Sequence, residues 1–394
     1  MSFVCHRRLQ PAILMGALCV LACSSVARAA ADESTEPLLR KLDATIDTAI
    51  AEGKLPGAVL YIGRVDNLVY QKAYGNRAVK PEPAAMTPDT IFDMASLTKP
   101  IATSTSIMIL AERGKLALAD KVAQHLPAFG NHGKEAITVE QLLLHQGGLI
   151  ADNAMSDYAG GAEAALAAIY NSTPKWEPGT HFTYSDVGFI VLGEVVKAVA
   201  GKPLDQFARE DIFVPLGMHD TSFNPPAALR PRMAPTEMRA GQWMQGEVHD
   251  PRAFALGGVA GHAGLFSTAA DVARFCQMIC QRGELAGRRI LTEDSVKTWT
   301  LVRYMADGTT GRTYGFDADT GYSSVRGDRF AKGVTFGHTG FTGTSLWIDP
   351  EHGGFVILLS NSVHPAGKGN VLALRRQVAT LAAELLQTTS AASE

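Results

Sequence analysis

A serine and a lysine three residues apart could carry out nucleophilic chemistry. They are Ser96 and Lys99, in the run Ser96-Leu-Thr-Lys99 after the apolar segment 91–95. The pattern predicts a helix from there to about Arg113, which places both side chains on one face. A serine hydroxyl is a weak nucleophile until its proton is removed, and a desolvated neutral lysine can help to remove it. The alternative is an N-cap serine followed by a surface lysine.

Two later segments could complete such a site. Tyr184-Ser185-Asp186 lies just before a predicted helix over 187–200, and His338-Thr339-Gly340 lies directly before a predicted strand. Read separately, Tyr184 is typical of a half-buried aromatic residue. Gly340 is likewise typical of a tight turn that enters a strand.

A fourth segment contains two histidines and many glycines. His249 and Asp250 are followed by Gly257-Gly258-Val-Ala-Gly261-His262-Ala-Gly264. Glycine allows the backbone to approach a ligand closely. The alternatives are a structural His249–Asp250 pair and a glycine bend. No third ligand stands at suitable spacing from the two histidines, so we expect no metal and no cofactor.

The elements that must position these residues are of two kinds. Strands are predicted near both ends of the chain, over 57–65, 68–74, 345–348 and 355–359. Apolar residues at helical spacing predict a helix that closes the chain, namely Val371, Leu374, Val378, Leu381 and Leu385. The middle of the chain has helical and loop patterns. We therefore predict an α+β fold with a discontinuous sheet domain, 30–115 plus 245–394, and an inserted helical domain, 116–244.

Composition and charge exclude several classes of protein. Of 394 residues, 46 % are hydrophobic and 19 % are charged, which is typical of a globular chain. The net charge is −3 and there is no basic block, so nucleic acid is a poor partner. We expect a small-molecule substrate and a monomer or weak oligomer.

The N-terminal segment 1–29 has the pattern of a secretory signal peptide. A basic start is followed by an apolar run over 11–22 and by Ala27-Arg28-Ala29. We therefore expect an exported, periplasmic or secreted protein without a transmembrane helix in the mature chain. A lipoprotein anchored at Cys23 and a buried N-terminal helix are the alternatives. Cys276 and Cys280, four residues apart on a predicted helix, are expected to be free thiols.

Together, the serine–lysine, tyrosine and histidine–threonine–glycine motifs resemble those of penicillin-recognising serine hydrolases. That family contains class C β-lactamases, D-Ala-D-Ala carboxypeptidases and related esterases. The Val248-His-Asp and Gly261-His-Ala-Gly patterns resemble its cell-wall branch, which includes penicillin-binding protein 4B and exo-acting N-acetylmuramoyl-L-alanine amidases. The resemblance covers nearly the whole mature chain and implies a β-lactamase/transpeptidase-like fold, an antiparallel sheet flanked by helices.

The resemblance also implies catalytic roles. Ser96 would form an acyl-enzyme, Lys99 and Tyr184 would share general-base work, and no metal or cofactor would be needed. The backbone N–H groups of Ser96 and Phe341 would form the oxyanion hole.

The resemblance further implies residues that contact the substrate. Asp186, Thr339 and Gly340 would contact it through the second and third motifs. His338 would contact a carboxylate, and His249 and His262 would contact polar groups of a sugar-peptide.

Two positions depart from the family pattern. Asp186 stands where asparagine is frequent, and an ionised carboxylate near Lys99 favours the charged lysine. Alternatively, Asp186 turns toward a hydrogen-bond donor. His338 stands where many β-lactamases have lysine, and neutral histidine holds a carboxylate less firmly. Both departures argue against efficient β-lactam hydrolysis. The resemblance to the cell-wall branch implies cleavage of an amide in peptidoglycan-derived peptides or muropeptides, by a carboxypeptidase or an amidase. An esterase, a weak β-lactamase and a non-catalytic penicillin-binding receptor are the alternatives.

Overall fold

One large antiparallel sheet forms the centre of the molecule. The computed structural model describes residues 1, 27–28, 35–367 and 369–391. The sheet has the order β1-β3-β2-β17-β16-β15-β14-β13-β12, and β4 pairs with β3. Its strands are β1 (Ala27–Arg28), β2 (Gly57–Arg64), β3 (Leu68–Ala78), β4 (Ala84–Ala85), β12 (Arg303–Tyr304), β13 (Gly311–Arg312), β14 (Asp317–Asp319), β15 (Phe336–Thr339), β16 (Ser345–Asp349) and β17 (Gly354–Ser360).

The two ends of the chain meet in this sheet. Strands β2 and β17 are antiparallel neighbours, with Leu60 opposite Leu358. β2 and β3 form the predicted early hairpin, and β16 and β17 form the predicted late one. The predicted α+β class with strands from both ends of the sequence is therefore confirmed.

Helices cover both faces of the sheet. Helices α1 (Glu36–Ala51) and α12 (Leu372–Ala391) lie side by side on one face, and α10 (Ala269–Cys280) packs against β2 and β17. The predicted stripe from Val371 to Leu385 is buried against the sheet, as the apolar spacing indicated. Cys276 and Cys280 of α10 are free thiols, as predicted.

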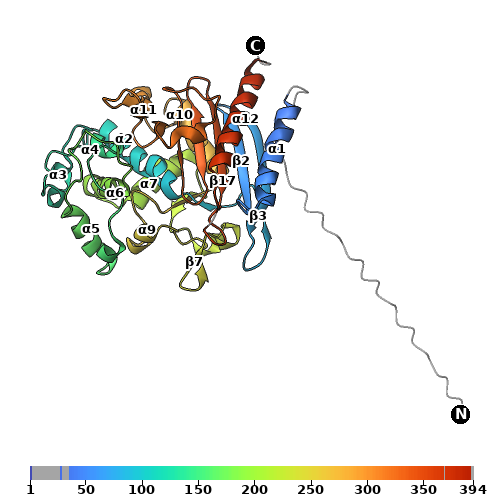
Figure 1. Cartoon of the computed structure of the whole chain (residues 1–394), viewed down its shortest axis with the longest axis horizontal. Coiled ribbons are helices and arrows are strands. Elements are labelled where there is room, and N and C mark those ends of the chain that lie inside the picture. The colour runs from blue at the N-terminus through green and yellow to red at the C-terminus, as the bar shows by residue number, and fades with distance from the viewer. Residues whose placement is uncertain (2–26, 29–34, 368, 392–394) are drawn as a thin grey trace.

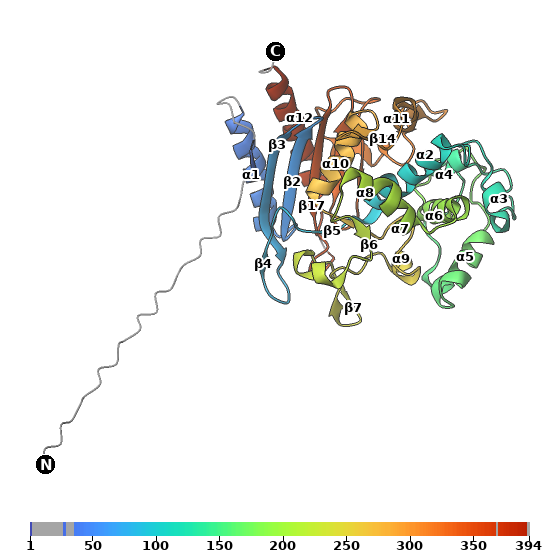
Figure 2. The same cartoon turned by 180° about the vertical axis from the view of Figure 1, so that it is seen from behind.

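Most other helices gather at one side of the sheet (Figures 1 and 2). They are α2 (Thr105–Glu112), α3 (Val122–His125), α4 (Val139–Leu143), α5 (Ala162–Tyr170), α6 (Asp186–Ala200), α7 (Leu204–Ala208), α8 (Val214–Leu216), α9 (Pro251–Ala255) and α11 (Glu293–Thr300). Helix α6 begins where the Ser185 hydroxyl accepts the Gly188 N–H, and it ends at Gly201, whose φ is 69°. A side-chain cap at the start and a left-handed glycine at the end are common helix boundaries.

A small sheet links the helical region to the rest. Its strands are β5 (Phe92–Asp93), β9 (Leu265–Ser267) and β6 (Ser222–Phe223), in that order. Two hairpins complete the strands, β7 (Met238–Arg239) with β8 (Gln242–Trp243) and β10 (Glu284–Leu285) with β11 (Arg288–Arg289). Strand β5 leads directly into the segment that carries Ser96, so this small sheet positions the predicted nucleophile.

The predicted signal peptide and Cys23 fall largely outside the described residues. Within segment 1–29, the structure describes Met1 and strand β1, which pairs with β3. Over the described ranges, each helix is too short or too polar to cross a bilayer.

Candidate active site

The segment around Ser96 is more irregular than the single predicted helix. Residues Ala95–Leu97 form a 3-10 turn, Lys99–Ser104 form a π-helix, and only then does α2 begin. Ala95 has a φ of 45°, a left-handed conformation that is uncommon for a residue with a Cβ. Wide turns and left-handed residues of this kind often mark functional sites. Single-sequence periodicity does not distinguish these turns from an α-helix, because residues 97–110 are buried on every side and show no separate exposed face.

A buried aspartate that sequence reasoning missed holds this strained turn. The Asp93 carboxylate accepts the Ala95 N–H at 2.8 Å and the His249 N–H at 2.7 Å. It thereby ties the turn before Ser96 to the histidine-containing loop. The available signal was an acidic residue within the apolar run 91–95, where a carboxylate needs buried hydrogen-bond donors.

Lys99 is the centre of the polar contacts at Ser96. Its Nζ donates to Ser96 Oγ at 3.0 Å and to the backbone carbonyl of His262 at 3.1 Å. The same Nζ lies 2.6 Å from Asp186 Oδ1, and the Lys99 side chain is fully buried. The predicted proximity of Asp186 to Lys99 is therefore present in the structure.

These contacts shift the pKa values of two groups beside Ser96. Burial is the largest effect and lowers the pKa of Lys99, but the charges and hydrogen bonds of Asp186 and Tyr184 together outweigh it and leave that pKa raised. Burial raises the pKa of Tyr184, and the positive charge of Lys99 opposes this effect. Lys99 is therefore an ammonium ion near neutral pH, held 4.9 Å from the centre of the Tyr184 ring.

The third motif forms a strand itself, which corrects the prediction that it lies before one. His338 and Thr339 belong to β15, which pairs with β14 and β16. Gly340 follows, and a Cβ there would lie 2.2 Å from Thr344 Oγ1 and 2.6 Å from the Met94 carbonyl oxygen. Glycine is therefore needed for β15 to approach the segment before Ser96.

The imidazole of His338 is neutral. Its Nδ1–H donates to the Thr339 carbonyl at 2.8 Å, which leaves Nε2 as an acceptor. Burial, followed by the positive charges of Arg312 and Lys99, lowers the pKa of His338 well below its ordinary value. His338 can accept a hydrogen bond in the site but supplies no positive charge.

His145 is a second residue that sequence reasoning missed. Its ring is 2 % exposed and lies 4.5 Å from the Tyr184 ring, and its Nδ1 accepts the Ser185 N–H at 3.0 Å. Its φ is 57°. His145 thus fixes the loop that presents Tyr184. The sequence offered little signal for this role, because the two residues are distant along the chain.

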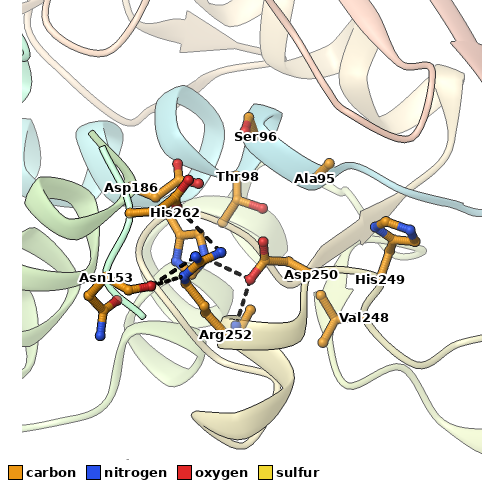
Figure 3. Close-up of polar contacts among 12 residues, drawn as sticks. Ala95, Ser96, Thr98, Asn153, Asp186, Val248, His249, Asp250, Arg252 and His262 are labelled. Carbon is orange, nitrogen blue, oxygen red and sulfur yellow. Dashed lines mark hydrogen bonds and ion pairs between the residues drawn. The ribbon is translucent and has the colours of Figure 1, made fainter. Parts of the chain in front are cut away.

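The side chains of the histidine-containing loop do not form the His249–Asp250 pair that the sequence analysis gave as an alternative. Asp250 Oδ1 bonds His262 Nε2 at 2.9 Å, and His249 Nε2 bonds Glu237 Oε2 at 2.6 Å, so His249 and Asp250 do not form a pair with each other. Figure 3 shows the His249 ring on the far side of Asp250 from His262. Asp250 also caps α9 by accepting the Ala253 N–H at 2.7 Å. Adjacent residues point in different directions here, which a sequence cannot show.

Three of these residues are close enough to share an ion. Asp186, Asp250 and His262 have potential ligand atoms within 4.8 Å of one another. The cluster contains only one of the two histidines, because His249 is bonded to Glu237 instead. Asp186 is already paired with Lys99, and Asp250 with His262. Both carboxylates of the cluster therefore already have a charged or hydrogen-bonding partner in the protein. Figure 3 shows the contact between Asp250 and His262, with Asp186 beside it.

Several of the predicted site residues line one cavity of about 530 Å³. They are Ser96, Tyr184, His338, Thr339, Gly340 and Phe341. Two other predicted residues, His249 and His262, are not among the described residues that line this cavity. His249 stacks on Phe341, with ring centres 5.4 Å apart, and His262 is 1 % exposed. His262 nevertheless contacts Lys99 through its carbonyl.

A serine paired with a buried lysine, beside a tyrosine and a strand of an antiparallel sheet, defines the class of serine hydrolases that form acyl-enzymes. The Beta-lactamase family model matches residues 42–381, and the chain belongs to this family. A putative D-alanyl-D-alanine carboxypeptidase of Escherichia coli (strain K12) is 31 % identical, over 83 % of this chain and 82 % of that protein. An N-acetylmuramyl-L-alanine amidase of Bacillus subtilis (strain 168) is also 31 % identical, over 83 % and 81 %.

Solved structures agree on the fold. A penicillin-binding protein homologue from Caulobacter crescentus superimposes with a TM-score of 0.72, at 22 % identity, over 92 % of this chain and all of that one. The predicted β-lactamase/transpeptidase-like fold and the predicted family are therefore both confirmed.

Proposed function

We propose that this protein is an exported serine hydrolase that cleaves an amide bond in peptidoglycan-derived peptides or muropeptides. The observation that carries the proposal is the 3.0 Å contact between Ser96 Oγ and Lys99 Nζ at a cavity also lined by Tyr184. The names of the two relatives support an amide of the cell wall as the substrate. The signal-like segment 1–29 supports export.

Acylation begins with attack of Ser96 Oγ on the amide carbonyl. Tyr184 reacts as its phenolate, which the positive charge of Lys99 stabilises. The Ser96 proton passes to this phenolate and turns it into a neutral phenol, because Lys99 is already protonated and cannot accept the proton. The C–N bond then breaks, the leaving amine takes the proton from Tyr184, and the acyl group remains as an ester on Ser96.

Deacylation reverses the roles of the same groups. Water attacks the ester carbonyl and gives its proton to Tyr184. The C–O bond to Ser96 breaks, and Tyr184 gives that proton to the Ser96 oxygen as the acid product leaves. The backbone N–H groups of Ser96 and Phe341 stabilise the oxyanion in both steps, as the family resemblance implies.

The test is product analysis after incubation of MurNAc-pentapeptide with the wild-type protein and with Ser96→Ala. We expect mass spectrometry to show either loss of one D-alanine or separation of the sugar from the intact peptide, with the wild type alone. The first product identifies a carboxypeptidase and the second an amidase. An unchanged substrate, with a folded protein that hydrolyses p-nitrophenyl butyrate, would overturn the proposed substrate class and favour an esterase.

A further inference from the structure

Asp93 is a buried aspartate whose contacts extend beyond the turn before Ser96. It is the last residue of β5 and is 2 % exposed. Its carboxylate accepts the Ala95 N–H at 2.8 Å and the His249 N–H at 2.7 Å. Its backbone carbonyl oxygen accepts a hydrogen bond from the Thr342 hydroxyl at 2.7 Å. Asp93 therefore joins segments that lie far apart in the sequence.

The contact with Ala95 fixes the backbone directly before the nucleophile. A carboxylate that accepts the N–H two residues ahead forms an Asx turn, which bends the chain locally. Ala95 has a left-handed φ of 45°, a conformation that persists only where surrounding groups hold it. The next N–H along the chain belongs to Ser96, so this turn sets the direction in which the Ser96 N–H points.

The contacts with Thr342 and His249 reach the segment that carries Phe341. Thr342 follows Phe341 in the chain, and the His249 ring stacks on the Phe341 ring with their centres 5.4 Å apart. Among the described residues, the Phe341 N–H has no backbone acceptor, and Phe341 lines the cavity together with Ser96. This N–H is therefore available to an oxygen atom in the cavity.

A second contact holds the same two segments together. The Thr344 hydroxyl donates to the Met94 carbonyl oxygen at 3.2 Å, and the Thr344 carbonyl oxygen accepts the Gly340 N–H at 2.7 Å. The turn over residues 340–343 is thus packed against the chain that leads from β5 to Ser96.

The Ser96 and Phe341 N–H groups are the pair that the family resemblance implies for the oxyanion hole. Ser96 lies in a 3-10 turn, and Phe341 lies in the turn after β15, so neither N–H is held by a regular strand or a long helix. Donors of this kind stabilise the charge of the transition state only if they are already in place, because moving them costs reorganisation.

We propose that Asp93 positions both donors of the oxyanion hole, through Ala95 on one side and through Thr342 and His249 on the other. Asp93 is not among the described residues that line the cavity, so it acts as a positioning residue and not as a catalytic one. This inference rests on the proposed function, because it concerns the attack of Ser96 on a carbonyl group.

The test compares p-nitrophenyl butyrate with its thiono analogue, in which sulfur replaces the oxygen of the scissile carbonyl. Sulfur is larger than oxygen and accepts hydrogen bonds more weakly, so donors spaced for an oxyanion stabilise the sulfur anion poorly. The readout is the ratio of kcat/KM for the oxygen ester to that for the thiono ester, divided by the same rate ratio for hydroxide. We expect a value well above one for the wild type. A defect that leaves the hole intact lowers both rates together and does not change this ratio.

Three variants should lower the ratio by different amounts. We expect a loss of about 10- to 100-fold in Asp93→Ala, because removal of one oxyanion-hole donor costs about 100-fold or more. Asp93→Asn should lose less, because the amide keeps one acceptor oxygen and loses the other. Thr342→Val removes the hydroxyl and keeps the branched shape, so we expect a loss of about two- to tenfold. The last two variants keep the test valid if Asp93→Ala does not fold.

Asp271→Asn is the matched control. Asp271 of α10 is also buried, and its carboxylate accepts the Asp220 N–H and the Thr221 hydroxyl, each at 2.8 Å. It is not among the described residues that line the cavity. Its substitution should lower stability and leave the ratio unchanged. Circular dichroism checks that each variant is folded.

The results distinguish failure of this inference from failure of the proposed function. If the wild-type ratio is well above one and folded Asp93→Asn and Thr342→Val keep it, the positioning role is wrong and the hydrolase assignment stands. A wild-type ratio near one, or a loss in Asp271→Asn as large as that in Asp93→Asn, would also overturn the inference. If the folded wild-type protein hydrolyses neither ester, the proposed hydrolase itself fails.

Discussion

The two sides of Ser96 satisfy their polar groups in different ways. On one side, which we call the loop side (residues 246–264), His262 is bonded to Asp250 and His249 to Glu237. On the other, which we call the strand side (β13–β15), Arg312 has two unpaired nitrogens. The loop side contains the residues with the more conspicuous sequence pattern, yet Nε2 of each imidazole already bonds a carboxylate. His262 Nδ1 has no partner among the described residues, but the charged groups of the loop side are paired.

The difference in partners indicates different roles. The loop side acts as a structural frame that stabilises its neighbours, and the strand side acts as a surface that can bind a ligand. Groups with internal partners stabilise the positions of their neighbours, and the His262 carbonyl holds Lys99 in this way. A buried charged group without partners has free capacity for a ligand. Substitutions on the loop side should therefore change stability and the Lys99 environment, whereas those on the strand side should change substrate selection.

The largest effect is expected where the two sides meet, at Lys99. Lys99→Met removes the hydrogen bond to Ser96 and leaves Asp186 without its cation, so kcat should fall about 10³-fold or more. The matched control is Lys134→Met, because Lys134 is also fully buried but is bonded to Asn131 and Ser172. Steady-state assays with p-nitrophenyl butyrate measure both. An equal loss of kcat in both variants would show that any buried lysine has this effect.

The next largest effect is expected on the free energy of unfolding, and it tests whether the loop side stabilises the structure. Burial acts to raise the pKa of Asp250, but the hydrogen bond and charge of His262 outweigh it and hold that pKa well below its ordinary value. Asp250→Asn should lower the free energy of unfolding by about 2 kcal/mol at pH 7, measured by urea denaturation.

The pH dependence of that loss has a definite sign. Because the folded-state pKa of Asp250 is depressed, its contribution is complete above its unfolded pKa of about 4 and is lost as pH falls further. The difference between the wild type and Asp250→Asn should thus shrink below pH 4. A difference that grows as pH falls would contradict the pairing.

A smaller effect tests how Asp186 couples the loop side to catalysis. Its negative charge raises the pKa values of Lys99 and Tyr184. Asp186→Asn should therefore move both limbs of the pH profile of kcat/KM to lower pH. A profile that keeps its position or moves to higher pH would show that this ion pair does not control the titration of the site.

The smallest effect concerns the contact between the two sides. Phe341 follows β15, is 72 % exposed and stacks on His249 of the loop side. Phe341→Ala should lower the free energy of unfolding by only about 0.5 kcal/mol, because an exposed aromatic pair contributes little. A loss several times larger, in the same urea experiment, would mean that the strand side is also part of the frame.

The sequence predicted the elements of the fold well, because their patterns are local. The hairpin β2–β3, helix α6 and the stripe on α12 were each visible as a period of apolar residues or as a capping residue. The ordered motifs led to the family, which the match over 42–381 confirms. The site roles of Ser96, Lys99 and Tyr184 remain predictions for the experiments above.

What the sequence could not predict depends on distant partners. Asp93 is important because His249 and Ala95 donate to it, and Arg312 because nothing in the described chain accepts from two of its nitrogens. The alternative of a His249–Asp250 pair was wrong for the same reason. The two residues are neighbours in the chain, but Asp250 bonds His262 and His249 bonds Glu237.

The measurement that tests the account most directly is the mass of the protein during turnover. The wild type is mixed with 3-(phenylacetylglycyloxy)benzoate, quenched with acid at short times and analysed intact and after proteolysis. The account predicts a phenylacetylglycyl adduct on the peptide that contains Ser96, which accumulates and then decays, and no adduct in Ser96→Ala. An adduct on another residue, or full turnover by Ser96→Ala, would contradict it.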